Sequence, residues 1–147
     1  MDKVEILILR NLLYNEEYLR KVIPFIKKDY FEDLNQRVIF EEVLNFVEKY
    51  NEPATKEILC IEVEKRSDIN DTSFTEVTKI ISYLENEVSD LDWIIDTTEK
   101  WCRDRAIYLA LMESIQLADG KDETKGRDAI PTILSDALAV SFDNHIG

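Results

Sequence analysis

The residue types that most often carry catalysis are scarce in this chain. Its single histidine, His145, stands near the C-terminus, and its two cysteines, Cys60 and Cys102, lie far apart, each within an apolar pattern. A Ser or Cys nucleophile needs a nearby base, usually His, and a zinc site needs clustered Cys and His. We therefore expect no catalytic residue, no zinc site, an exposed His145, and buried, reduced cysteines of the kind found in cytoplasmic proteins.

Phosphate binding by a P-loop requires a Gly-rich turn followed by Lys and Ser or Thr. Glycine occurs only at positions 120, 126 and 147, so the chain has no such loop. The nearest candidate, Gly120-Lys121-Asp122, follows a predicted helix and has acidic neighbours, and we interpret Gly120 as the glycine that ends that helix. The sequence therefore predicts no nucleotide site and no cofactor in this chain.

Carboxylates are plentiful, and pairs such as Glu41 with Glu48, or Asp92 with Asp96, could share a helix face. A carboxylate metalloenzyme is therefore one hypothesis, and bound iron or manganese would support it. No predicted helix carries the Glu-x-x-His repeat of a di-metal bundle. We interpret these acids as solvated helix faces and expect no metal site.

Trp93, Trp101 and Tyr108 fall on one predicted helix and could stack nucleic acid bases. Platforms that bind single strands combine such aromatics with a positive groove. Here the formal net charge is −13 and no long segment is basic. We expect weak or no direct DNA binding, and we interpret the three aromatics as core or interface packing.

The composition indicates an all-α fold, because 45% of the residues are apolar while Gly and Pro occur only three times each. Few helix breakers favour long helices. No run reaches the roughly 18 apolar residues of a membrane span, and the start Met-Asp-Lys-Val-Glu is not typical of a signal peptide. We expect neither export nor membrane insertion.

Apolar residues spaced by three and four predict a head of about five helices over residues 1–88. Asn15, Thr55 and Ser73 are the expected N-caps, with Ser73 forming a capping box with Glu76. On the third helix we expect Glu41, Glu42, Glu48 and Lys49 on the side opposite the apolar positions. The expected helices are 4–13, 16–26, a helix with apolar positions from Leu34 to Val47, one from Thr55 to near Ser67, and one carrying Val77, Ile80, Ile81 and Leu84.

Residues 90–143 are predicted to form a two-helix antiparallel hairpin. A helix of about thirty residues begins at Asp90, a charged loop follows Gly120, and Pro131 stands at the start of the second helix. From Ala106 to Met112 seven consecutive residues are apolar or aromatic, which indicates burial on more than one side. We therefore predict self-association through this hairpin. The residues expected to carry it are Ile107, Leu109, Leu111, Met112, Ile115, Ile133, Leu134 and Leu138.

Several blocks of the sequence together resemble a known family. They are Val4–Leu7 with Leu12–Asn15, Asp29–Phe31, Arg37–Phe40, the Glu52-Pro53 break, Trp93 with Thr98–Lys100 and Arg105-Ala106, and Ala129–Pro131 with Ala137-Leu138 and Ser141–Asp143. In this order they resemble the N-terminal domain of DnaB-type replicative helicases, most closely that of the T-even phages. The similarity covers nearly the whole chain.

This resemblance implies a collar domain without catalytic activity. Hairpins would pair subunits into dimers, three dimers would form the collar of a hexameric ring, and the collar would dock the primase and the helicase loader. Residues 144–147 would begin the linker to a motor domain that this chain lacks. ATP and Mg²⁺ are accordingly expected only for the full-length helicase, in the cytoplasm of the host cell.

A different class of protein also fits the charge. A free-standing acidic adaptor or inhibitor could bind a basic partner, for instance by mimicking the charge of DNA. A reading frame that continues past Gly147 into a phosphate loop would favour the helicase, and a stop codon there would favour the adaptor.

Overall fold

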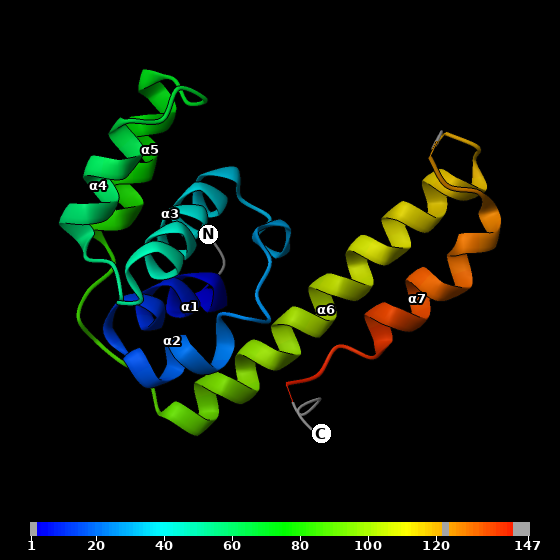
Figure 1. Cartoon of the computed structure of the whole chain (residues 1–147), viewed down its shortest axis with the longest axis horizontal. Helices are drawn as coiled ribbons and strands as arrows, with labels where there is room; N and C mark the ends of the chain where they lie inside the picture. The colour runs from blue at the N-terminus through cyan, green and yellow to red at the C-terminus, as the bar shows by residue number, and fades with distance from the viewer. Residues whose placement is uncertain (1–2, 122–123, 143–147) are drawn as a thin grey trace. The chain divides into compact units, whose positions relative to one another are not determined.

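The structure, a computed structural model, describes residues 3–121 and 124–142. Within these ranges every regular element is helical and no strand occurs, so the predicted all-α class is confirmed. The chain divides into two compact units, residues 1–95 and 96–147. Figure 1 shows the order of the helices along the chain. Among the described residues, no helix has the length and apolar character needed to cross a membrane.

The first unit contains five complete helices, as expected for the head. They are α1 (Lys3–Tyr14), α2 (Glu16–Val22), α3 (Leu34–Tyr50), α4 (Lys56–Glu64) and α5 (Asp71–Ser82), with a 3-10 turn, η1 (Lys28–Tyr30), between α2 and α3. Helix α3 packs against α1, α4 and α5 and lies at the centre of the core. The predicted domain limits, 1–88 and 90–143, remain a prediction, and the expected linker 144–147, with His145, lies outside the described residues.

Local capping signals place most helix ends of the first unit. The side chain of Asn15 accepts the backbone N–H of Tyr18 at 3.2 Å, and the Thr55 hydroxyl accepts that of Ile58 at 3.2 Å, which confirms both N-caps. Helix α2 ends at Val22 rather than at 26. Ile23 still has helical backbone angles and donates to the Leu19 carbonyl, but Pro24 has no N–H to continue the helix, and the Phe25 N–H bonds to the Val22 carbonyl three residues back.

The predicted N-cap Ser73 is wrong. Helix α5 begins two residues earlier, at Asp71, and Asn70 is its N-cap. The side-chain oxygen of Asn70 accepts the backbone N–H of Ser73 at 2.8 Å. Asn is at least as good an N-cap as Ser, so the earlier residue caps the helix and Ser73 becomes a residue of its first turn.

The predicted solvent side of α3 is also wrong at Glu42. Its side chain is 10% exposed and accepts a hydrogen bond at 2.7 Å from Arg66, which follows α4 and is itself 15% exposed. Arg66 also binds Asp68 at 2.7 Å. We call these three residues the Arg66 clasp. It joins the middle of α3 to the loop between α4 and α5, and a buried carboxylate is tolerated there because its cation is held in place.

Helix α1 is tied to the chain that follows α5. The Asn11 side chain accepts the backbone N–H of Ser89 at 3.1 Å and donates to the Ser89 hydroxyl at 3.2 Å. The Tyr14 hydroxyl donates to the Leu84 carbonyl at 2.9 Å. Asn11 is fully buried and Leu84 lies in the core. The core of the first unit is therefore complete only after residues 84–89 have packed against α1.

The second unit holds the predicted hairpin. Helix α6 (Leu91–Ala118), which begins in the first unit, enters it at Asp96, and a 3-10 turn, η2 (Arg127–Ala129), leads into α7 (Ile130–Leu138). The Asp90 side chain caps α6 by accepting the Trp93 N–H at 3.0 Å. Gly120 has φ 72°, which confirms it as the helix-ending glycine. Helix α7 ends at Leu138, so the last residues of the predicted hairpin, which extended to 143, are not part of the helix as far as they are described.

Candidate self-association surface

One face of α6 is turned toward the chain that leaves α7. The Glu99 carboxylate accepts the backbone N–H of Phe142 at 2.6 Å and the Ser141 hydroxyl at 3.3 Å. Four residues later, Arg103 donates through Nε to the Val140 carbonyl at 3.0 Å. These three bonds hold the end of the hairpin against α6 (Figure 1).

The same face of α6 continues as a buried seam. Ala110, Ser114 and Leu117 follow Glu99 and Arg103 at helical spacing and are 6%, 8% and 2% exposed. The side chains at positions 110 and 114 of the seam are small. This face is therefore already used within the unit.

The opposite face of α6 carries four exposed apolar or aromatic side chains. Tyr108, Leu111, Met112 and Ile115 are 48%, 48%, 43% and 54% exposed. Their spacing of three and four places them on one stripe, and at about 100° per residue this stripe lies on the far side of α6 from the seam. We call these four residues the apolar stripe. Nothing in the described part of this unit covers it.

Helix α7 adds a second exposed apolar position. Leu138 is 65% exposed, and Leu134, one turn earlier on the same side, is half-buried. Ala137, at 7% exposed, and the half-buried Ile133 lie on the other side of α7, one turn apart. The short α7 thus has an inner side and an apolar flank, as α6 does.

The eight residues predicted for self-association fall into two groups. Leu111, Met112, Ile115 and Leu138 are exposed, whereas Ile107, Leu109, Ile133 and Leu134 are half-buried. Three of the exposed four lie together on the apolar stripe, and Leu138 stands apart on α7. The prediction omitted Tyr108, although its spacing from Leu111, Met112 and Ile115 follows the same helical pattern.

Charged residues border the apolar stripe. The Arg105 guanidinium lies 4.9 Å from the centre of the Tyr108 ring, close enough for a cation–π contact. One turn before Tyr108, Asp104 pairs with Lys100 at 2.7 Å. Such exposed pairs contribute little to stability, but they surround an apolar strip with charge, as the polar rim of an interface does.

Among the described residues, the side chains that could carry chemistry do not converge on a catalytic site. Cys102 is buried as expected, and burial together with the nearby Glu99 carboxylate raises the pKa of its thiol to about 12. The prediction was wrong for Cys60, which is half-buried, because its side of α4 is covered only in part. In residues 3–121 and 124–142, no three His, Cys, Asp or Glu side chains gather into a group that could hold a metal ion.

The aromatics of α6 do not form one stacking platform. Trp101 is 8% exposed, whereas Trp93 and Tyr108 are 51% and 48% exposed. Trp101 therefore packs in the protein interior, and the exposed Trp93 and Tyr108 lie four turns apart along α6.

Comparison with known proteins supports the predicted resemblance. No family model matches the chain. The DnaB-like replicative helicase of Enterobacteria phage T4 is 28% identical to it over 149 aligned positions, which cover 96% of this chain and 31% of the helicase. The resemblance to a T-even phage replicative helicase is thereby confirmed. The chain spans about a third of the length of that relative.

Proposed function

We propose that this chain is the non-catalytic N-terminal collar domain of a replicative helicase and that its hairpin joins it to a second copy. The similarity to a phage replicative helicase along nearly the whole chain supports the first part. Since the match covers 31% of that protein, ATP and Mg²⁺ would act in a motor that this chain does not include.

The apolar stripe is the observation that carries the second part of the proposal. Each of its side chains is about half exposed, so covering it would stabilise an assembly by about 1 kcal/mol per side chain. Two copies of the stripe together would contribute about 8 kcal/mol, which is comparable to the free-energy cost of bringing two molecules together. Because the gain and the cost nearly cancel, the stripe alone gives little net affinity, and further contacts such as the exposed Leu138 of α7 must add to it. With that addition we expect a reversible dimer whose population depends on protein concentration.

The collar function implies further partners. Three such dimers would form the collar of a hexameric ring in the cytoplasm, and the collar would dock the primase and the helicase loader. The acidic surface, with a formal charge of −13, fits protein partners better than it fits direct contact with DNA.

Light scattering with a matched pair of variants tests self-association. Ile115→Asp places a charge on the apolar stripe, whereas Ile61→Asp makes the same change on α4, and both isoleucines are 54% exposed. We expect the wild type and Ile61→Asp to gain mass with concentration and Ile115→Asp to remain monomeric. A wild type that stays monomeric at high concentration, or equal behaviour of the two variants, would contradict the proposal.

The acidic adaptor remains the second candidate, because the net charge favours it. The salt dependence of assembly distinguishes the collar domain from the adaptor, because apolar association persists at high ionic strength while binding between opposite charges weakens. Assembly that disappears in high salt, with tight binding to a basic protein in low salt, would favour the adaptor.

A further inference from the structure

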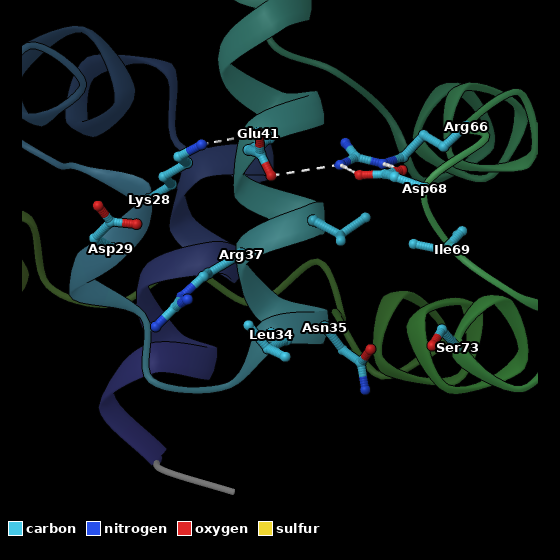
Figure 2. Close-up of a pocket in the computed structure, with 11 residues that line it drawn as sticks. Lys28, Asp29, Leu34, Asn35, Arg37, Glu41, Arg66, Asp68, Ile69 and Ser73 are labelled. Carbon is cyan, nitrogen blue, oxygen red and sulfur yellow. Dashed lines mark hydrogen bonds and ion pairs between the residues drawn. The ribbon is translucent and has the colours of Figure 1, made fainter.

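A pocket of about 330 Å³ lies in the first unit, away from the hairpin. It is lined by the first half of α3, by η1, by the loop between α4 and α5 and by the first turn of α5, and Figure 2 shows the side chains that line it. No sequence motif indicated this pocket, because its walls come from three separate parts of the chain. Its size suits one or two side chains of a bound peptide.

Most charges around the pocket are already paired. Arg66 binds Asp68 at 2.7 Å and Glu41 at 3.5 Å, and Lys28 lies 3.8 Å from the second oxygen of Glu41. Figure 2 marks these pairs with dashed lines. Since these two carboxylates have cations beside them, they leave little demand for a further cation.

Arg37 differs from the other cations of the pocket. Its Nε donates to the Phe31 carbonyl at 2.6 Å, which orients the guanidinium, while its two terminal nitrogens bond to none of the described residues. The side chain is half-buried. A half-buried guanidinium with unused donors is stabilised strongly by a carboxylate, which can accept two parallel hydrogen bonds. Asp29 also lines the pocket and has no partner among the described residues, but it is exposed and can be hydrated by water.

The rest of the pocket offers apolar contact beside Arg37. Leu34, on the turn before Arg37, is 69% exposed, the highest value among the large apolar side chains described as exposed, and Val38 and Ile69 also line the pocket. We propose that this pocket binds a short peptide segment of a partner protein in which an acidic residue stands next to a bulky aliphatic one. The carboxylate would bind Arg37, and the aliphatic side chain would cover Leu34 and Ile69.

Nuclear magnetic resonance titration of the whole chain with blocked dipeptides tests the proposal. The probe is acetyl-Asp-Leu-amide, and acetyl-Asn-Leu-amide and acetyl-Asp-Ala-amide are its matched controls. We expect the probe to shift the Arg37 Nε–H and the methyl groups of Leu34 and Ile69, and to bind about tenfold more tightly than either control. Equal binding of all three peptides, the same shifts with inorganic phosphate alone, or no shifts well above millimolar concentration would overturn the proposal.

Variants with opposite expected effects sharpen this test. Arg37→Gln should weaken binding of the probe about tenfold, whereas Asp29→Asn should tighten it by removing a negative charge that repels the peptide carboxylate. Leu34→Ser, at a position too exposed to matter for folding, should weaken binding of the Asp-Leu peptide but not of the Asp-Ala peptide. Lys27→Gln, an exposed charge change outside the pocket, is the control and should have no effect. If Lys27→Gln acts like Arg37→Gln, net charge rather than the pocket explains the binding. All these residues lie in the first unit, so this result does not depend on hairpin self-association.

Discussion

Replacing Arg66 by Met should destabilise the first unit strongly. Methionine keeps an apolar stem of similar length but removes the cation that binds Glu42 at 2.7 Å. Glu42 would then be a 10% exposed carboxylate without a counter-charge. Breaking a fully buried ion pair in this way costs about 3–5 kcal/mol. Because both partners retain some contact with water, we expect a loss of about 2–3 kcal/mol in the free energy of unfolding.

Urea denaturation followed by circular dichroism measures this loss. Two further variants test whether the loss comes from the unpaired charge of Glu42. Lys65→Met changes the neighbouring residue, whose pair with Glu62 at 3.1 Å is exposed, and should cost less than about 0.5 kcal/mol. The double variant Glu42→Met with Arg66→Met removes both buried charges and should recover most of the stability lost by Arg66→Met alone.

Two outcomes would refute the reasoning on the Arg66 clasp. One is an Arg66→Met variant no less stable than Lys65→Met. The other is a double variant whose loss equals the sum of the losses of Arg66→Met and Glu42→Met, each measured alone, because that result would mean that Glu42 and Arg66 do not interact. Either outcome would leave the loop between α4 and α5 held by apolar packing alone.

The clasp also predicts a dependence on pH. The hydrogen bond from Arg66 holds the pKa of the Asp68 carboxyl below its ordinary value. A carboxyl whose pKa is lower in the folded state stabilises the fold above its unfolded pKa, and this contribution is lost as the pH falls through the folded value. The wild type should therefore lose more stability than Arg66→Met on acidification below about pH 4. Urea denaturation over that pH range measures both losses, and equal losses in the two proteins would contradict the prediction.

Other predictions concern helix ends and thiols. Asn70→Ala should cost about 1 kcal/mol of unfolding free energy and Ser73→Ala much less, since only the first removes an N-cap; the reverse order in urea denaturation would restore Ser73 as the cap. Gly120→Ala should cost about 1 kcal/mol in the same measurement, because the residue has φ 72°, and an unchanged stability would argue against a left-handed turn. At pH 8, iodoacetamide should alkylate Cys60 well before Cys102, because the Cys102 thiol is buried and its pKa is raised to about 12. Peptide mass spectrometry measures the two rates, and equal rates would contradict the burial of Cys102.

The sequence could predict the helices because their signals are local. Asn15, Thr55 and Gly120 act on backbone groups within a few residues, so their neighbours in the sequence suffice. The N-cap of α5 was missed because Asn70 and Ser73 are both good caps, and only the structure decides between them. Most residues of the apolar stripe could also be predicted, because the helical spacing of Leu111 and Ile115 can be read directly from the sequence.

Features that depend on distant residues could not be predicted in this way. Glu42 looks like a solvated residue until Arg66, on another element, is placed beside it. The pocket at Arg37 was likewise invisible, because it needs η1, α3 and the loop before α5 together. Tyr108 was omitted from the predicted surface because an aromatic within a long apolar run gives no indication of which side of the helix remains exposed.

The bonds from α1 to residues 84–89 have a consequence for synthesis on the ribosome. At about 5–20 residues per second, the partners of Asn11 and Tyr14 are made about 4–15 s after α1 itself. During this interval the apolar side of α1 has no complete core to enter. The first unit should therefore fold late in its own translation, and the nascent chain should attract chaperones until Ser89 has left the exit tunnel.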